Sequence, residues 1–396
     1  MAVSGKLRRQ MAEGGWIRKM FEEGIALKKQ FGEDKVFDLS LGNPVLEPPE
    51  EFRRELRKWV NTPVSGMHRY MPNAGYPETR AAVAEHLSAS TGLPFTLNEV
   101  IMTCGAAGAI NAVLKAILEA GDEVIIFSPF FVEYIYYIDN HQGAARTVVA
   151  DENFVPDLRA LENAITPRTR AVLVNSPNNP TGVVYSEETI RGLGEVLGRK
   201  EKEYGREIFL VSDDVYRKLV YDGIECPYAF HYHPATIVTT SHSKDLALPG
   251  ERIGYVAVNP SYADRAELVN GLVFANRVLG YVNAPALMQN VVRVLQDASV
   301  DIELYRKKRD LLYESLVGMG YSVVKPMGAF YIFPRSPIED DAAFVRLLQE
   351  QRVLTVPGRG FGSPGFFRIS YCVEDRVIEG SLAGFRLAAK KCGLRG

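Results

Sequence analysis

RAVLVNSPNNPTG, residues 170–182 of this 396-residue chain, is an apolar run that ends abruptly in small and polar residues. Two later segments, IFLVSDDVY (208–216) and TIVTTSHSK (236–244), repeat this pattern. Short β-branched runs of this kind predict buried strands. In open α/β sheets, ligands bind beyond the carboxyl ends of the parallel strands. We therefore expect four polar side chains to share one edge of a sheet: Asn179, Asp213, Tyr216 and Lys244.

Helical and strand patterns alternate on both sides of these segments. Helices are predicted at 77–90, 106–118 and 186–203, and a Tyr-rich helical segment lies between the strands EVIIF (123–127) and ARTVVA (145–150). A further strand is predicted at RIGYVAV (252–258). This alternation is typical of an α/β fold, in which helices flank both faces of a mostly parallel sheet.

The alternation ends near residue 285, which suggests a second domain. A long helical region at 286–317 is followed by short apolar runs and by helices at 341–350 and from residue 374 onward. These features predict a smaller α+β domain. The N-terminal segment, with a helix at 7–31, precedes the sheet pattern and is expected to join it. Since 396 residues exceed one simple core, we predict a large domain at 51–285 and a small domain at 1–50 plus 286–396.

Composition excludes several classes of protein. The chain is 46% hydrophobic and 24% charged, with a net charge of −2, which does not suggest nucleic-acid binding. Apolar stretches are interrupted before about 18 residues, and the N-terminus lacks a secretory pattern, so we expect neither a membrane span nor export. Four scattered cysteines without a CxxC pair indicate reduced thiols, a cytoplasmic location and no metal site: Cys104, Cys226, Cys372 and Cys392.

A fourth polar element opens a predicted helix. Residues 103–108, TCGAAG, would leave backbone N–H groups free at the helix N-terminus, where an anion such as phosphate binds. Taken singly, each element is common: a Gly/Ala-rich helix start is usually a tight turn, NNPTG a turn cluster, Lys244 a solvated side chain and Asp213 an N-cap. The order in which they occur together is what indicates function.

In that order the elements resemble the class I/II aminotransferases, fold-type I enzymes that use pyridoxal 5′-phosphate (PLP), and among them the aspartate aminotransferase branch. The resemblance spans nearly the whole chain and is strongest at three motifs: NSPNNPTG (175–182), SDDVY (212–216) and SHSKDLALPGERIGY (241–255). Supporting motifs are LSLGNP (39–44), YMPNAGYPETR (70–80), TCGAAGAI (103–110), SPFFVEY (128–134) and FFRISY (366–371). The fold it implies is the PLP-transferase type I fold, with a mostly parallel seven-stranded sheet and a smaller α+β domain.

The resemblance implies a role for each matching residue. Lys244 would carry PLP as a Schiff base and then move the proton between substrate and cofactor, which suits a lysine of lowered pKa. Asp213 would face the pyridine nitrogen and keep it protonated, so that the ring acts as an electron sink. Tyr216 and Asn179 would bond the ring's phenolic oxygen, and Phe131 would lie against the ring face. The catalytic residues would be Lys244, Asp213 and Tyr216.

The resemblance also implies a phosphate site and a partner subunit. Backbone groups and side chains would hold the phosphate: Gly105, Ala106, Ala107, Ser241, Ser243 and Arg252. Many relatives carry Ser, Thr or Gln within 105–107, so backbone donors must suffice where this chain has Ala-Ala. Tyr70 would reach across a subunit interface to the other cofactor's phosphate, which implies a homodimer with shared active sites.

On the substrate side, Arg368 would bind the α-carboxylate through a bidentate fork, together with Asn179, and Gly42 would let backbone approach the substrate. The implied reaction is transamination between an L-amino acid and a 2-oxo acid, with glutamate and 2-oxoglutarate as one pair and aspartate first among candidates for the other. A dicarboxylate needs a second cation. Alignment on Asn283 puts Val278 where some relatives supply an arginine, so Arg277, one residue away, is the candidate.

Alternative functions remain open at this level. The same fold and cofactor support β-elimination of cysteine conjugates or decarboxylation, and the same pocket would suit apolar or aromatic amino acids. A ligand-sensing regulator is disfavoured, because only about 50 residues precede the fold's core and they show no helix-turn-helix pattern. An inactive homologue is disfavoured because Lys244, Asp213 and Arg368 are all present.

Overall fold

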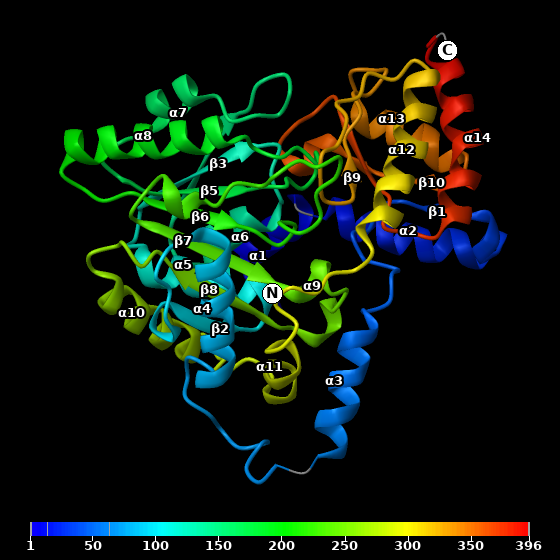
Figure 1. Cartoon of the computed structure of the whole chain (residues 1–396). Coiled ribbons are helices and arrows are strands. Elements are labelled where there is room, and N and C mark those ends of the chain that lie inside the picture. The colour runs from blue at the N-terminus through cyan, green and yellow to red at the C-terminus, as the bar shows by residue number, and fades with distance from the viewer. Residues whose placement is uncertain (1, 14, 63, 395–396) are drawn as a thin grey trace.

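The computed structural model describes residues 2–13, 15–62 and 64–394. Its centre is a seven-stranded sheet with the order β2-β8-β7-β6-β5-β3-β4 (Figure 1). The strands are β2 Val100–Thr103, β3 Glu123–Ser128, β4 Ala144–Val149, β5 Thr169–Asn175, β6 Phe209–Asp213, β7 Thr236–Ser241 and β8 Gly254–Val258. Strands β3 to β7 run parallel, and β8 is antiparallel to both of its neighbours. The predicted fold class is confirmed.

Helices cover both faces of this sheet because its strands are apolar on both sides. Val124 and Ile126 of β3 pack with α5 (Gly105–Ile117), α6 (Glu133–Asn140) and α10 (Arg265–Val278), whereas Ile125 and Phe127 face the core shared with α7 (Leu158–Ala164) and α8 (Glu187–Tyr204). This alternation follows from the two-residue period of a strand. Strands β2 and β8 pack on α4 (Pro77–Thr91) at the sheet's end.

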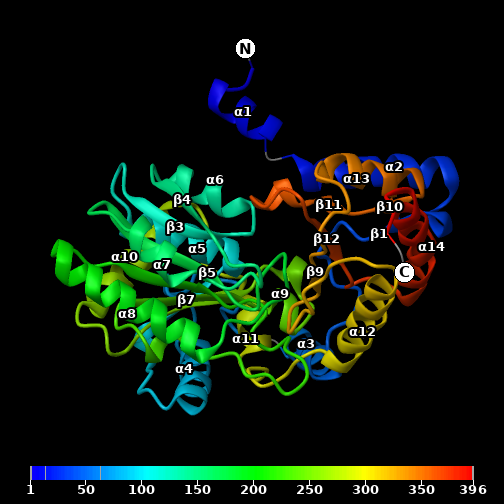
Figure 2. The same cartoon turned by 90° about the horizontal axis from the view of Figure 1, so that it is seen from above.

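Helix α2 (Trp16–Phe31) lies with the C-terminal elements, apart from the large sheet (Figures 1 and 2), whereas Lys6 and Gln10 of α1 (Gly5–Glu13) contact Asp139 of α6. Strand β1 (Phe37–Asp38) pairs in parallel with β10 (Val353–Leu354), and a second small sheet has the order β11-β12-β9. The remaining elements of this region are α2 Trp16–Phe31, α12 Ile302–Gly318, β9 Tyr331–Ile332, α13 Asp341–Glu350, β11 Val356–Pro357, β12 Phe367–Ser370 and α14 Asp375–Lys391. We propose residues 51–285 and 1–50 plus 286–396 as the two domains.

The structure corrects several predicted elements. The single helix expected at 7–31 is two helices, α1 (Gly5–Glu13) and α2, and Gly15, a residue poor in helix propensity, directly precedes α2. The helical region at 286–317 is likewise two helices, α11 (Ala286–Val292) and α12. Strand β2 and helices α7 and α10 were not predicted. The first two are short, and α10 lacks a clean apolar stripe since Phe274 and Val278 are exposed.

Sheet register brings the polar tails of three strands together, as predicted. Asn175 at the end of β5 pairs with Asp213 at the end of β6, which in turn pairs with Thr239 of β7. Lys244 follows β7 on the one-turn helix α9 (His242–Asp245). No helix in the described parts of the chain is long and apolar enough to cross a membrane.

Candidate active site

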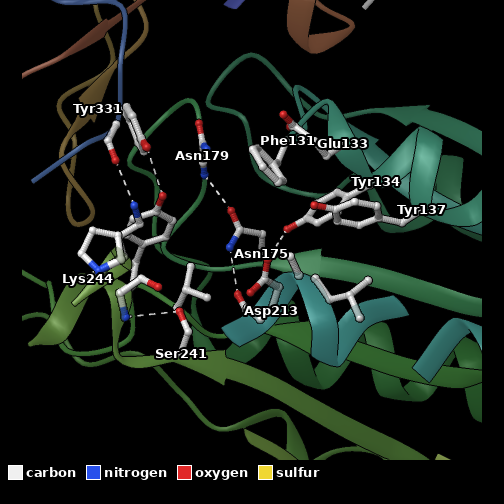
Figure 3. Close-up of a pocket in the computed structure, with 18 of the residues that line it drawn as sticks. Phe131, Glu133, Tyr134, Tyr137, Asn175, Asn179, Asp213, Ser241, Lys244 and Tyr331 are labelled. Carbon is white, nitrogen blue, oxygen red and sulfur yellow. Dashed lines mark hydrogen bonds between the residues drawn. The ribbon is translucent and has the colours of Figure 1, made fainter. Parts of the chain in front are cut away.

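A cavity of about 290 Å³ lies at this edge of the sheet (Figure 3). Its walls contain every residue proposed from the motifs except Gly105 and Tyr70. The residues it brings together are Gly42, Ala106, Ala107, Phe131, Asn179, Asp213, Tyr216, Ser241, Ser243, Lys244, Arg252 and Arg368. It also contains residues that the motifs did not single out: Ile110, Glu133, Tyr134, Tyr137, Asn175, Val215, Pro249 and Tyr331.

Lys244 faces the cavity from α9. Its Nζ donates a hydrogen bond of 2.9 Å to the Gly42 carbonyl oxygen and lies 5.4 Å from the centre of the Phe330 ring. Burial lowers the pKa of Lys244 to about 8, and the nearby positive charges of Arg368 and Arg252 act in the same direction. A lysine with a lowered pKa is neutral often enough near pH 7–8 to attack a carbonyl carbon and to accept a proton.

Asp213 lines the same cavity and has one oxygen without a hydrogen-bond partner in the described part of the chain. Its Oδ2 accepts a hydrogen bond of 2.5 Å from the Tyr134 hydroxyl, while its buried Oδ1 has no hydrogen-bond partner among the described residues. Burial raises the pKa of Asp213 to about 7, although the Tyr134 hydrogen bond opposes that rise. A buried carboxylate oxygen without a partner costs free energy, so a ligand that brings an N–H donor fits this position. The protonated nitrogen of a pyridine ring is such a donor.

Asp214 points the other way although it is the next residue. Its carboxylate accepts hydrogen bonds from Ser212 Oγ at 2.5 Å and from Arg217 Nε at 2.8 Å, and it lines a separate cavity. All of these partners are protein groups. Of the two adjacent carboxylates, only Asp213 is therefore available to a ligand in the main cavity.

Arg368 is a buried cation without an acidic partner. It is 2% exposed and donates to the Ser40 carbonyl oxygen at 2.6 Å and to Asn179 Oδ1 at 3.1 Å. Its guanidinium stacks 4.7 Å from the ring centre of Tyr331, and its hydrogen bonds to described residues go to neutral oxygens. Its buried Nε has no partner in this part of the chain. A buried, uncompensated guanidinium favours an anionic ligand, and a carboxylate matches its planar fork.

Two glycines allow groups to approach closely. A Cβ on Gly42 would lie 1.9 Å from the Tyr331 hydroxyl oxygen, and that hydroxyl lies 3.1 Å from the Tyr216 hydroxyl. Gly105 has a φ of +70°, and a Cβ there would lie 2.9 Å from Arg252 Nη2. The sequence suggested that a side chain at Gly42 would crowd the substrate, whereas the structure identifies Tyr331 as the group it would strike.

The part of the cavity at the N-terminus of α5 suits a phosphate. The N-terminus of α5, at residues 105–107, has first-turn backbone N–H groups without helical acceptors. Ser241, Ser243 and the Arg252 guanidinium line the cavity there as well. Arg252 donates only to carbonyl oxygens, those of Pro249 and Cys104, so its charge is not neutralised by a described carboxylate. This combination matches the helix-terminus phosphate sites that proteins commonly use.

Tyr70 and Arg277 lie outside the cavity of their own chain. Tyr70 is 92% exposed, so it is not a core side chain, and it borders a surface hollow with Met71 and Tyr281. Arg277 is exposed on α10, where it stacks 5.1 Å from the Phe274 ring centre. Their expected roles in a partner's site remain predictions, since the structure contains one chain.

Taken together, the amine, the free carboxylate oxygen, the uncompensated guanidinium and the helix terminus fit PLP and an amino-acid carboxylate. No group of three or more metal-binding side chains occurs within residues 2–13, 15–62 and 64–394. The additional wall residues were missed for different reasons. Tyr134 and Glu133 stood inside the SPFFVEY motif without an assigned role, and Tyr331 comes from a segment that carried no motif.

Comparison with known proteins adds independent information. Residues 34–383 match the family model described as Aminotransferase class I and II. The chain is 36% identical over 366 residues to a probable aspartate/prephenate aminotransferase of Thermus aquaticus, covering 88% of this chain and 90% of the relative. It is 33% identical over 356 residues to a probable N-acetyl-LL-diaminopimelate aminotransferase of Bacillus subtilis, with 88% of each chain covered. The solved structure of an aminotransferase from Eubacterium rectale superposes with a TM-score of 0.96 at 41% identity, covering 99% of this chain and 100% of the other.

Proposed function

Because the chain belongs to the class I and II aminotransferases, which are PLP-dependent enzymes, we propose that it exchanges an amino group between an L-amino acid and a 2-oxo acid, with glutamate and 2-oxoglutarate as one pair. The observation that carries this proposal is that Lys244 lines the same cavity as Asp213, whose Oδ1 has no hydrogen-bond partner among the described residues. The cofactor, when bound, supplies a ring that withdraws electrons from the substrate Cα. The protein supplies the proton transfers and the positioning.

Lys244 has two tasks in this proposal. Its neutral amine would hold the cofactor, and its Nζ would accept the proton from the substrate Cα and hold it. A pKa near 8 suits both tasks, since the amine is then neither permanently charged nor too weak a base. The Gly42 carbonyl oxygen, 2.9 Å from Nζ, orients the amine.

Asp213 and Arg368 fix the orientation of cofactor and substrate. Asp213 Oδ1 would accept the N–H of the ring nitrogen, while Tyr134 holds the other carboxylate oxygen in place. Arg368 would bind the α-carboxylate beside Asn179, to which it is already hydrogen bonded at 3.1 Å. Ser241, Ser243, Arg252 and the residue 105–107 backbone would bind the phosphate, with Tyr216 and Phe131 around the ring.

The second amino acid depends on the side-chain pocket. Relatives named as aspartate/prephenate aminotransferases make aspartate the first candidate, and the N-acetyl-LL-diaminopimelate aminotransferase relative supports an alternative substrate. Aspartate requires a further cation, for which we propose Arg277 of a partner subunit in a homodimer in which Tyr70 also enters the neighbouring site. The four cysteines form no disulfide within the described residues, which supports our proposal of a cytoplasmic location.

The test is the half-reaction of the purified, PLP-loaded protein. Addition of L-glutamate alone should convert the cofactor band to that of the amine form in one turnover, and 2-oxoglutarate should restore the original band. Steady release of ammonia and pyruvate from a cysteine conjugate, without the reversible change in absorbance, would instead identify a C–S lyase.

A further inference from the structure

One charged group in the cavity has no role in the proposed reaction. Glu133 stands at the start of α6, two residues after Phe131, and lines the same wall (Figure 3). Its Oε2 is shielded from solvent and makes no hydrogen bond to any described residue. An orphaned carboxylate oxygen at a substrate pocket costs free energy until a donor reaches it.

Glu133 and Arg368 line the same cavity. Burial raises the pKa of Glu133, although a hydrogen bond from its own backbone N–H and the nearby charge of Arg368 oppose that rise. Burial raises the pKa of the Tyr137 and Tyr331 hydroxyls, which line the same cavity, and the charge of Glu133 adds to that rise. A substrate whose α-carboxylate occupies Arg368 would therefore direct its side chain past Glu133.

The cations of the cavity are all required elsewhere. Among the described residues, its only lysine and arginine side chains are Lys244, Arg252 and Arg368. In the proposed function Lys244 and Arg252 bind the cofactor and Arg368 binds the α-carboxylate. A substrate side-chain carboxylate would thus meet Glu133 without a compensating charge from this chain, and like charges at short range repel strongly.

We propose that Glu133 is a specificity-determining residue, which accepts a hydrogen bond from an amide or ammonium group on the substrate side chain and disfavours a carboxylate at that position. The inference rests on the proposed transamination and, within it, replaces aspartate as first candidate by substrates whose side chain carries an amide or ammonium group. Aspartate then becomes a poorer substrate than its isosteric amide, asparagine. The preference is a ratio of kcat/KM values between the amide and the carboxylate substrate. Glutamate therefore still serves as an amino donor, at a lower rate than glutamine.

Substrate pairs of equal size separate charge from shape. The PLP-loaded protein is mixed in a stopped-flow instrument with asparagine or aspartate, with glutamine or glutamate, and with lysine or norleucine. Alanine is the reference, because its methyl group does not reach Glu133. The same series is run on Glu133→Gln, which keeps the size and removes the charge, and on the matched control Glu152→Gln, an exposed carboxylate outside the cavity. Dissociation constants of the unreactive pair succinate and succinamate, from the cofactor absorbance, provide a readout independent of turnover.

We expect kcat/KM of the parent protein to be higher for asparagine, glutamine and lysine than for aspartate, glutamate and norleucine, respectively. The expected factor is about 10- to 100-fold, the range for one charge-assisted hydrogen bond. Glu133→Gln should bring these ratios, and the succinamate-to-succinate ratio, to within about threefold of unity, with alanine changed less than about threefold. Glu152→Gln should match the parent. A parent that prefers aspartate to asparagine, or ratios that survive in Glu133→Gln, would overturn the assignment while alanine still supports transamination. Failure of all amino acids to convert the cofactor would instead reject the proposed function.

Discussion

Replacing the two adjacent carboxylates one at a time, Asp213→Asn and Asp214→Asn, should separate cofactor chemistry from folding. Both side chains are buried, at 5% and 3% exposure. Asp213 keeps one oxygen free toward the cavity, whereas Asp214 is bound on both sides by Ser212 and Arg217. The first change should therefore impair the reaction, and the second should impair the stability of the fold.

The magnitudes follow from the environment of each group. Burial raises the pKa of Asp213 from 3.8 to about 7, which corresponds to a free-energy difference on the order of 4 kcal/mol. Since the folded pKa exceeds the unfolded value, the folded apoprotein binds more protons between pH 3.8 and 7. The contribution of Asp213 to the free energy of unfolding is therefore most favourable below pH 3.8. It decreases as the pH rises from 3.8 to 7, and above about pH 7 the free energy of unfolding is lower by about 4 kcal/mol. Asp213→Asn removes this decrease in stability at high pH, because the amide does not ionise. Asp214→Asn breaks the buried ion pair with Arg217, which costs about 3–5 kcal/mol of stability.

Urea unfolding of the apoproteins at pH 5 and pH 8 measures the stability side. Asp213→Asn should be more stable than the parent by up to about 4 kcal/mol at pH 8 and by less at pH 5, and Asp214→Asn should be less stable at both. Stopped-flow half-reactions with alanine measure the chemistry. Asp213→Asn should lose at least about 100-fold, because a neutral amide cannot hold the proton on the ring nitrogen. A larger kinetic loss in folded, PLP-loaded Asp214→Asn, or an Asp213→Asn apoprotein without the extra stability at pH 8, would refute the reasoning.

Lys244→Ala should retain PLP noncovalently yet lose more than the ~10²–10⁴-fold of a lone general base, and activity within tenfold of the parent would remove Lys244 from the reaction. Gly42→Ala should lower kcat/KM by about 10-fold or more by displacing the Tyr331 hydroxyl, which a Cβ would approach to 1.9 Å; an unchanged value would show that the contact relaxes freely. Light scattering at assay concentration should give a dimer, and Tyr70→Phe should weaken PLP binding measured by absorbance; a fully active monomer contradicts both. Arg277→Leu tests the competing assignment to aspartate: a selective decrease in kcat/KM for aspartate relative to alanine, equivalent to about 2–5 kcal/mol, would support it, and equal changes would exclude Arg277 from the site.

Most of the fold was predictable because its signals are local. The apolar runs before NSPNNPTG, SDDVY and SHSK predicted three neighbouring strands, and sheet register then placed Asn175 beside Asp213. Elements were missed where the local signal is weak. One helix was predicted where the structure has α1 and α2, because a glycine within a helical pattern is a weak stop signal. The four residues of β2 are too few for a periodic pattern to appear.

By itself, the sequence placed Asp213 and Lys244 at the ends of two parallel strands, and its resemblance to a known family indicated the cofactor class and the role of Arg368. Only the tertiary structure decided what surrounds them. Tyr134 lies 79 residues from the carboxylate it orients, and Tyr331 lies 115 residues from the Tyr216 hydroxyl it contacts. The orphaned oxygens of Asp213 and Glu133 likewise appear only once every neighbour is in place. Whether a polar atom has a partner is set by contacts between distant segments, and these depend on packing that no local pattern encodes.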